Sequence, residues 1–552
     1  MDSLQRLADL DAVARLRSRD TSLFSDDAEG QALAENSLGW THVAENSAEV
    51  IDQLRHIAED AEDGLADVVL LGMGGSSLAA LVLRDALAAD DAPRLHVLDT
   101  TCPRTIASLL ATLDPATTIY LVSSKSGGTI EPISLYTIFR EVADSALGYE
   151  AAGRRFIALT DPGSPLERLA IGSGFHTLVS TPPDIGGRFS ALTPFGLLPA
   201  VLQGIEIELL VGRARHMEAG LNLDSQTNPA AGLAAFIADN HAAGRDKLTI
   251  VTSPKLRSFG LWCEQLIAES LGKNGVGVVP VVELSDDLPQ GYGPDRAIVV
   301  VRLKDDERLA EWVPKLKEMA PTGELVLRDA YDIGAEFTRW EHAVALLGPL
   351  FGVNPFGQPN VQAAKDATNA VLADALAIPE PTACTQGGVT LTFAGDLPDP
   401  GHEEPSLAAA LGHALAAIRP HDYLALLAYL PEDALLLEPL TTAVPQVSAA
   451  TGAAVTLEIG PRYLHSTGQL HKGGPNTGVF VVVTTRDAAD APVPGKKWGL
   501  RTLFRAQAEG DLATLVAAGR RVLRVDLPDS SEDSVTTLAH ALLEAAGVTW
   551  EA

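Results

Sequence analysis

The stretch that decides the fold is VVLLGMGGSSLAALVLRDALAA, residues 68–89, together with TIYLVSSKSGGTIEPISLYTIFREV, residues 118–142. Each begins with a short apolar run, passes through a loop of small and hydroxyl residues, and ends in an amphipathic helical pattern. Strands that are apolar on both faces and alternate with helices are typical of a parallel sheet covered on both sides. The two stretches therefore predict an α/β fold with a doubly wound parallel sheet.

The same alternation continues along the 552 residues of the chain, which is too long for one compact core. Further apolar runs are LHVLDTTCP (95–103), RRFIALTDPGSP (154–165), LTIVTSP (248–254), RAIVVVRL (296–303), YLALLAYL (423–430) and GVFVVVTT (478–485). We therefore expect a helical cap over residues 1–60, a first α/β domain over residues 61–240, and a second, enlarged α/β domain over residues 241–552.

Composition and charge restrict the partners. The chain has 41 Lys and Arg against 72 Asp and Glu, a formal net charge of −31. This charge repels nucleic acid and anionic lipid, so we expect neither as a partner, and a bound phosphate must be held by local amides and a few cations. The opening residues lack an apolar signal core, no run is long enough to cross a bilayer, and the three cysteines are widely separated. We expect a cytoplasmic protein without disulfides and without a metal site.

Two loops that follow predicted strands share one design. Residues 72–77 (GMGGSS) and residues 123–129 (SSKSGGT) each leave an apolar strand and open a helix. Glycines let the backbone approach a ligand, hydroxyls add donors, and a helix N-terminus favours an anion. Neither loop has the full dinucleotide-binding or Walker A spacing. The pair predicts a site for a phosphate ester of a small polar molecule, and the alternative is a pair of tight turns.

A carboxylate closes the apolar face of the helix predicted over residues 256–273. The residues of this face, spaced three and four apart, are Phe259, Trp262, Leu266 and Glu269. Burying a carboxylate is costly unless it is paired or functional. Glu269 is therefore a candidate general base for taking a proton from carbon, and the alternative is a helix-end pair with Lys273.

An arginine follows two glycines in IGGRFS, residues 185–190. The fixed charge of Arg188 suits a phosphate or an enediolate oxygen, and the alternative is an ordinary surface cation. Further along, NPFGQP, residues 354–359, precedes a predicted helix that carries Lys365.

The loop GPRYLHSTGQLHKGG, residues 460–474, places His465 and His471 among small and polar residues. Two histidines six residues apart without an acidic neighbour make a poor metal site. An imidazole acid or base is the better functional interpretation, and the alternative is a solvated loop with incidental histidines.

Together these motifs resemble those of the glucose-6-phosphate isomerase (phosphoglucose isomerase) family, which is built from two sugar-isomerase (SIS) domains. The matching stretches are GMGGS (72–76), SKSGGTIEP (124–132), GGRFS (186–190), ESLGK (269–273), FGQPNVQAAK (356–365) and HSTGQLHKGG (465–474). The resemblance is greatest to the isomerase half of fused transaldolase/glucose-6-phosphate isomerase proteins. It implies two SIS-type doubly wound parallel-sheet domains, of which the second is enlarged here.

The resemblance implies an aldose–ketose isomerase that interconverts D-glucose 6-phosphate and D-fructose 6-phosphate through a cis-enediol(ate), in glycolysis and gluconeogenesis, without a cofactor. It implies that Glu269 moves the proton between C1 and C2 and that Arg188 steadies the intermediate. It also implies that His465 and Lys365 assist ring opening. The residues implied to hold the phosphate or the sugar are Gly75, Ser76, Ser124, Lys125, Ser126, Thr129 and Gln358.

The chain departs from the family pattern in three ways. SKSGGT replaces SKTFTT, ESLGK lacks the usual asparagine, and the motif with Gln358 and Lys365 precedes the motif with His465, whereas the family has the reverse order. His342, in RWEHAVALL, is therefore a second candidate for ring opening.

Two alternatives to a glucose-6-phosphate isomerase stay open, and so does the oligomeric state. A non-catalytic SIS-domain sugar-phosphate sensor is one, and an isomerase that also accepts mannose 6-phosphate is another. The family is usually dimeric, so a homodimer is one expected state, and a single chain that supplies His465 itself is the other.

Overall fold

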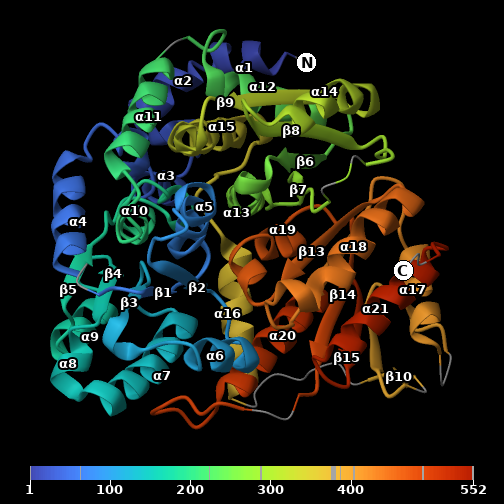
Figure 1. Cartoon of the computed structure of the whole chain (residues 1–552). Helices are drawn as coiled ribbons and strands as arrows, with labels where there is room; N and C mark the ends of the chain where they lie inside the picture. The colour runs from blue at the N-terminus through green and yellow to red at the C-terminus, as the bar shows by residue number, and fades with distance from the viewer. Residues whose placement is uncertain are drawn as a thin grey trace.

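The structure is a computed structural model, and it describes residues 2–61, 64–222, 224–285, 287, 289–373, 381–385, 387–401, 405–487 and 490–549. Three β-sheets, each with helices packed against it, make up this part of the chain (Figure 1). None of the helices in the described ranges is both long and apolar enough to cross a membrane.

Helices occupy the chain before the first strand. They are α1 (Ser3–Asp9), α2 (Ala12–Arg17), η1 (Thr21–Leu23), α3 (Ala28–Glu35), η2 (Gly39–His42) and α4 (Ala48–Ala61). The spacing of three between Ile51, Leu54 and Ile57 gives α4 one apolar face, which is buried.

The first sheet is wholly parallel, with the strand order β2-β1-β3-β4-β5. Its strands are β1 (Asp67–Leu71), β2 (Arg94–Leu98), β3 (Thr118–Ser123), β4 (Phe156–Thr160) and β5 (Thr177–Ser180). The connecting helices are η3 (Gly74–Ser76), α5 (Leu78–Leu87), α6 (Pro103–Leu110), η4 (Pro115–Thr117), α7 (Ile130–Leu147), α8 (Tyr149–Gly153) and α9 (Pro165–Gly172). All residues of β1, β3 and β4 are buried, as expected for strands covered on both faces.

Helices then lead to a second parallel sheet with the order β7-β6-β8-β9. The helices are η5 (Gly187–Phe189), α10 (Pro194–Val201), α11 (Ile207–Gly220) and α12 (Pro229–Ala242). The strands are β6 (Lys247–Thr252), β7 (Val279–Val282), β8 (Arg296–Leu303) and β9 (Thr322–Leu327). The accompanying helices are η6 (Pro254–Leu256), α13 (Arg257–Leu271), α14 (Glu307–Met319), η7 (Ala330–Asp332), α15 (Ile333–Phe351) and α16 (Pro359–Leu372).

The third sheet is mixed, with the order β10-β11-β15-β14-β12-β13. Its strands are β10 (Ala383–Cys384), β11 (Thr390–Gly395), β12 (Tyr423–Ala428), β13 (Ala454–Ile459), β14 (Gly478–Thr485) and β15 (Arg521–Leu527). The last four are mutually parallel, whereas β10 and β11 form an antiparallel edge. Its helices are α17 (Leu407–Ala416), α18 (Ala434–Thr451), η8 (Arg462–His465), α19 (Gly468–Gly473), α20 (Leu500–Ala517) and α21 (Glu532–Ala545).

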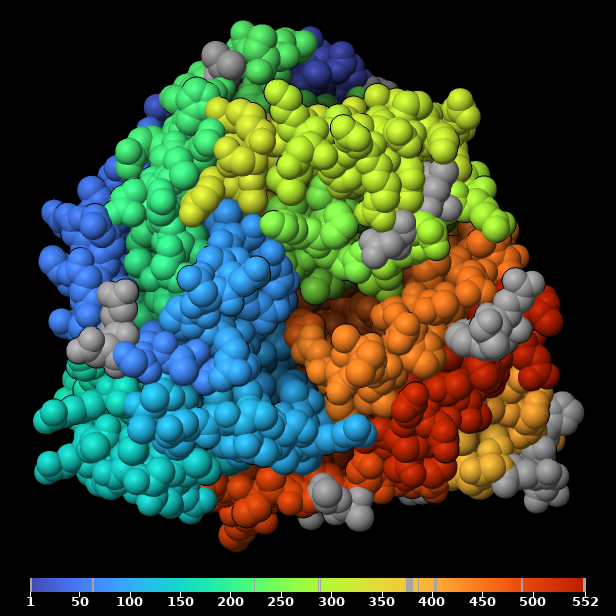
Figure 2. Space-filling view, viewed as in Figure 1, coloured from blue at the N-terminus to red at the C-terminus, as the bar shows by residue number. Residues whose placement is uncertain are grey.

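The three regions pack into one body. A single hydrophobic core runs from the N-terminal helices through one face of the first sheet to the second sheet. The core on the other face of the first sheet also contains Val493, from the connection between β14 and α20, and Leu500, the first residue of α20. In Figure 2 the blue-to-cyan, green-to-yellow and orange-to-red parts of the chain lie against one another on the visible face.

The predicted α/β class with parallel sheets is confirmed. The enlarged region after residue 240 contains two separate sheets, one of four strands and one of six. The expected domain limits at residues 60 and 240 stay a prediction.

Candidate active site

The two loops expected to hold a phosphate lie side by side at the carboxyl edge of the first sheet. β1 pairs with β3, so the loops after Leu71 and Ser123 leave adjacent strands. From β1 the chain passes to β2 on one side and returns as β3 on the other, and such switch points are where open α/β sheets bind ligands. The Ser123 hydroxyl donates to the carbonyl oxygen of Ser76 at 2.9 Å and ties the loops together.

The loop between β3 and α7 borders a cavity with its hydroxyls and glycines, of which Ser126 and Thr129 line the wall. The Ser124 hydroxyl donates to the Thr129 hydroxyl at 3.1 Å, behind this lining. Gly127 has a φ of 65°, and a Cβ there would lie 2.7 Å from the backbone nitrogen of Leu166, so the position requires glycine. The loop runs directly into α7, whose N-terminal amides favour an anion.

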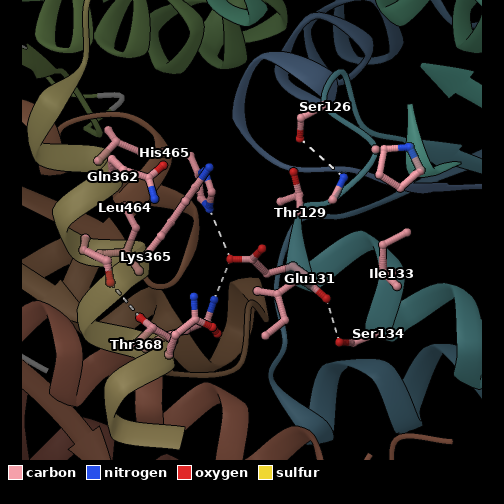
Figure 3. A pocket seen from close by; sticks show the side chains of 18 of the residues that line it. Ser126, Thr129, Glu131, Ile133, Ser134, Gln362, Lys365, Thr368, Leu464 and His465 are labelled. Carbon is pink, nitrogen blue, oxygen red and sulfur yellow. Dashed lines mark hydrogen bonds and ion pairs between the residues drawn. The ribbon is translucent and has the colours of Figure 1, made fainter. Parts of the chain in front are cut away.

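The cavity has a volume of about 660 Å³ and lies between the first region of the chain on one side and helix α16 with the third region on the other. One wall is the loop before α7, and the opposite wall is formed by α16 and the loop after β13 (Figure 3). In that view Lys365 and His465 face Thr129 and Glu131 across the space. Four of the predicted site residues therefore line one cavity: Ser126, Thr129, Lys365 and His465.

A histidine–carboxylate pair lies on the cavity wall. Nε2 of His465 is 3.1 Å from Oε1 of Glu131, and Nε2 of Gln507 donates to the same oxygen at 2.7 Å. The other carboxylate oxygen of Glu131 is buried and has no hydrogen-bond partner within the described part of the chain. A buried carboxylate oxygen without a partner is uncommon in folded proteins.

Electrostatics keep Glu131 in its charged form. Burial raises the pKa of this carboxyl, but the charge and hydrogen bond of His465 outweigh burial, and the charge of Lys365 adds to them. The pKa of Glu131 therefore lies below its usual value, and the pair can position the imidazole as an acid or a base.

The predicted base and the predicted cation meet in a buried cluster beside the cavity. Nη1 of Arg188 lies 3.3 Å from Oε1 of Glu269, and both side chains are nearly inaccessible. The guanidinium also donates to Ser270 Oγ at 2.8 Å, to Gln358 Oε1 at 2.8 Å and to the carbonyl oxygen of Pro355 at 2.6 Å. Burial lowers the pKa of Arg188, and the charge of Glu269 partly offsets this. Arg188 is therefore not an ordinary surface cation.

Glu269 does not form the helix-end pair with Lys273 that was the alternative to a catalytic role. Its ion pair is with Arg188, whereas the ammonium of Lys273 donates to the carbonyl oxygens of Asn354 and Gly357. Three of the predicted residues, Arg188, Glu269 and Gln358, thus form one polar cluster in the interior.

Gln265 connects this cluster to the cavity. Its Nε2 donates to Oε2 of Glu269 at 3.2 Å and to the carbonyl oxygen of His465 at 2.7 Å. Gly74, in the first loop, packs so closely that a Cβ there would lie 2.8 Å from this amide nitrogen. A Cβ on Gly75 would lie 2.1 Å from the backbone of Gly187, just before Arg188. The first loop, the base and the histidine are therefore packed against one another.

Several predicted phosphate ligands lie behind the cavity lining. The ammonium of Lys125 pairs with Asp161 and donates to the carbonyl oxygen of Pro183 at 2.9 Å, so it is already engaged. The carbonyl oxygen of Gly75 accepts from the Ser190 hydroxyl at 3.2 Å. The predicted roles of Lys125, Gly75, Ser76, Ser124 and Gln358 stay predictions.

His342, the second candidate for ring opening, lies apart from the cavity. It is buried in α15, where Nδ1 is 2.8 Å from the carbonyl oxygen of Thr338 and its ring packs edge-on against Trp40. Burial lowers its pKa to about 4. The geometry favours His465 for contact with a ligand in the cavity.

One group of candidate metal ligands occurs within the described ranges. Two of its members directly precede strands β6 and β8, at the amino ends of these strands in the second sheet. The group consists of Asp246, Asp295 and His421. The Lys247 ammonium lies 2.8 Å from Asp246 Oδ1 and 3.4 Å from Asp295 Oδ2, and it also donates to the carbonyl oxygen of His421. This lysine already neutralises the carboxylates, so we assign no metal to the group.

Glu131, Gln265 and Gln507 are site residues that were not predicted from the sequence. Glu131 stands inside the quoted SKSGGTIEP, directly after the loop, and Gln265 is four residues before Glu269 on one helix. Residues four apart share one face of a helix, so the spacing from Glu269 is a signal that could have indicated Gln265. Gln507 has no local signal, because α20 reaches the cavity only through the packing of the third region.

Known proteins similar to this chain agree with the resemblance. A family model described as phosphoglucose isomerase matches residues 34–279. The glucose-6-phosphate isomerase of Rubrobacter xylanophilus is 30% identical over 376 residues, which cover 59% of this chain and 85% of that protein. The enzyme of the same name from Acetivibrio thermocellus is 30% identical over 394 residues, covering 61% and 87%.

A solved structure shares the fold. The glucose-6-phosphate isomerase from Chlamydia trachomatis D/UW-3/Cx superposes with a TM-score of 0.53 at 18% identity, over 65% of this chain and 78% of that chain. The likeness to fused transaldolase proteins stays a prediction.

Proposed function

The chain belongs to the phosphoglucose isomerase family, and on that premise we propose that it interconverts D-glucose 6-phosphate and D-fructose 6-phosphate, a step of glycolysis and gluconeogenesis. The observation that carries this proposal is one cavity that joins the hydroxyl loop before α7 to the pair of His465 and Glu131. A site for an anion and an acid–base pair are what a sugar phosphate that must open its ring requires.

In the proposed reaction the phosphate binds Ser126, Thr129 and the first amides of α7. Lys365 adds positive charge from the opposite wall. His465 transfers a proton between the ring oxygen and the O1 hydroxyl as the C1–O5 bond breaks, and Glu131 holds the imidazole in position.

The carbon chemistry is assigned to Glu269. Its carboxylate takes the proton from C2 of the open aldose, which leaves a cis-enediolate with its charge on O1. It then returns that proton to C1, while the hydroxyl proton of O2 passes to O1 and the carbonyl forms at C2. Arg188, 3.3 Å from this carboxylate, stabilises the negative charge of the intermediate. For this step the C1–C2 end of the sugar must reach Glu269, which the Gln265 amide links by hydrogen bonds to the backbone of His465 at the cavity.

The test is a coupled assay with fructose 6-phosphate and glucose 6-phosphate, run on the wild type and on Glu269→Gln. We expect turnover by the wild type and a loss of about 10²–10⁴-fold in kcat for the variant. Exchange of the C1 or C2 proton with deuterated solvent must fall in parallel. Inorganic phosphate should bind both proteins equally, because the loop before α7 is unchanged.

The same assay separates the alternatives. A sensor would bind the sugar phosphate without turnover by the wild type, and the His465–Glu131 pair would then have no role. Turnover of mannose 6-phosphate would extend the substrate range to a second aldose.

Homodimer formation and a location in the cytoplasm are also part of the proposal. Within one copy, Lys365 and His465 line the cavity and Arg188 pairs with Glu269. Light scattering after size exclusion measures the oligomeric state directly.

A further inference from the structure

A strap from the third region of the chain reaches the rim of the cavity. This strap, residues 490–500, connects β14 to α20, and Lys496 from it lines the same cavity as Ser126 and Thr129. Lys496 is distant in sequence from every residue assigned to the phosphate above. Its presence at the cavity therefore results from tertiary structure.

The strap is held in one conformation by its own backbone. Pro492 and Gly499 form an isolated antiparallel bridge, and the amide of Leu500 donates to the carbonyl oxygen of Ala491 at 2.8 Å. Within this loop the amide of Lys496 donates to the carbonyl oxygen of Val493 at 3.0 Å, which closes a tight turn.

Two apolar side chains fix the strap to the first sheet. Val493 and Leu500 are 2% and 0% exposed and belong to the core that also contains Tyr120, Phe139 and Phe156. The strap is thus anchored against the helices that surround the phosphate loop, and the position of Lys496 relative to that loop is set by packing.

Within the described ranges of the chain, the charge of Lys496 has no carboxylate partner. Its side chain is exposed, its ammonium lies 5.7 Å from the centroid of the Trp498 ring, and no carboxylate among the described residues pairs with it. In contrast, Lys125, the lysine of the loop itself, is already paired with Asp161. The ammonium of Lys496 therefore keeps three donors for a ligand.

We propose that Lys496 is a phosphate-binding residue of this cavity, so that the dianionic ester of the substrate is held between the loop before α7 and the strap. This inference rests on the proposed function for the identity of the substrate. Its physical basis is the formal charge of −31, which repels a phosphate ester at long range and makes an unpaired cation at the cavity rim effective in capture.

The experiment compares Lys496→Ala and Lys496→Arg with Lys497→Ala. Lys497 is the next residue, is also exposed and is not among the residues that line the cavity, so its variant removes the same charge from the same strap. Titration calorimetry with inorganic phosphate measures affinity without any turnover. Steady-state kinetics with fructose 6-phosphate then separates KM from kcat, each at low and high salt.

We expect Lys496→Ala to raise the Kd of phosphate and the KM by about three- to tenfold at low salt, with kcat within about twofold of wild type. The difference should shrink in about 0.5 M salt, and Lys496→Arg should stay near wild type. Equal phosphate affinities for Lys496→Ala, Lys497→Ala and the wild type would overturn the inference. Weakened phosphate binding in a protein without isomerase activity would uphold the inference and contradict the proposed function instead.

Discussion

Oε1 of Glu131 lies 3.1 Å from Nε2 of His465, although the two residues are 334 positions apart in the chain. Glu131 belongs to the first turn of α7, and His465 ends the short helix η8 after β13. This contact joins the first and third regions at the cavity wall, so the chemistry of the histidine depends on how these regions pack.

Glu131→Gln is expected to lower the free energy of unfolding by about 1–3 kcal/mol at pH 7. Burial raises the pKa of Glu131, but His465 and Lys365 hold it below its usual value of 4.5. A carboxyl whose folded pKa is depressed stabilises the fold fully above its unfolded pKa, and this stabilisation is lost as the pH falls through the folded pKa. Urea unfolding at pH 7 and near pH 3.5 should therefore show a smaller effect of the variant at the lower pH.

The control for this variant is Glu141→Gln, an exposed carboxylate on the same helix, which should change stability by less than about 0.5 kcal/mol at either pH. An effect of Glu131→Gln that is the same at both pH values would contradict the ion pair as its cause.

Gln265→Leu is expected to lower kcat by about ten- to a hundredfold with little loss of stability. The substitution removes the amide that contacts Glu269 and the carbonyl oxygen of His465. It also removes the carbonyl oxygen of Gln265, which is buried without a partner in the described structure, so the two effects on folding oppose each other. Thermal unfolding measures the stability of the variant, and steady-state kinetics measures its kcat. An unchanged kcat would show that the hydrogen bonds of Gln265 to Glu269 and His465 have no catalytic role.

Gly127→Ala is expected to weaken phosphate binding by at least about tenfold, because the residue has a φ of 65° and its Cβ would clash with the backbone of Leu166. Gly128→Ala is the matched control. No atom lies within 4 Å of a Cβ placed at Gly128, so this variant should bind phosphate within about twofold of wild type. Calorimetry with inorganic phosphate measures both, and similar affinities for the two variants would be inconsistent with the described loop.

Asp99→Asn is expected to destabilise the protein by about 3–5 kcal/mol and to lower kcat. Asp99 is fully buried at the end of β2 and accepts hydrogen bonds from Arg462 at 2.6 and 2.8 Å. Arg462 opens the short helix that ends at His465, so loss of this pair loosens the loop that carries the histidine. Denaturant unfolding measures the loss of stability, and steady-state kinetics measures the loss of kcat.

The control is Glu432→Gln, which removes the second and more exposed carboxylate on Arg462. Its effect on stability should stay below about 1 kcal/mol. If both variants cost the same, the buried pair with Asp99 is not what holds the loop.

Local patterns were sufficient for much of the fold. The apolar runs at residues 68–71 and 118–123 are strands buried on both faces, and the loops after them lie at adjacent strand ends. Such features follow from strand pairing and helix spacing, which involve near neighbours in the chain. The division of the region after residue 240 into two sheets did not follow, because apolar runs do not specify their partner strands.

Local patterns likewise did not specify which residues of the candidate site contact one another. The motifs identified Arg188 and Glu269, and the structure places them 3.3 Å apart. They did not indicate that Lys125 pairs with Asp161 or that Lys496 lines the cavity. These contacts join residues from different elements, and only the packing of those elements decides them.

The sequence by itself determined the parallel-sheet architecture, the small and hydroxyl composition of the paired loops and the residue types available for acid–base chemistry, because each depends on periodicity and side-chain type. Tertiary structure decided which charges are neutralised and which face the cavity. The three regions of the chain meet because they bury apolar surface contributed by residues far apart in sequence. That burial brings Glu131, His465 and Lys496 to the wall of one cavity.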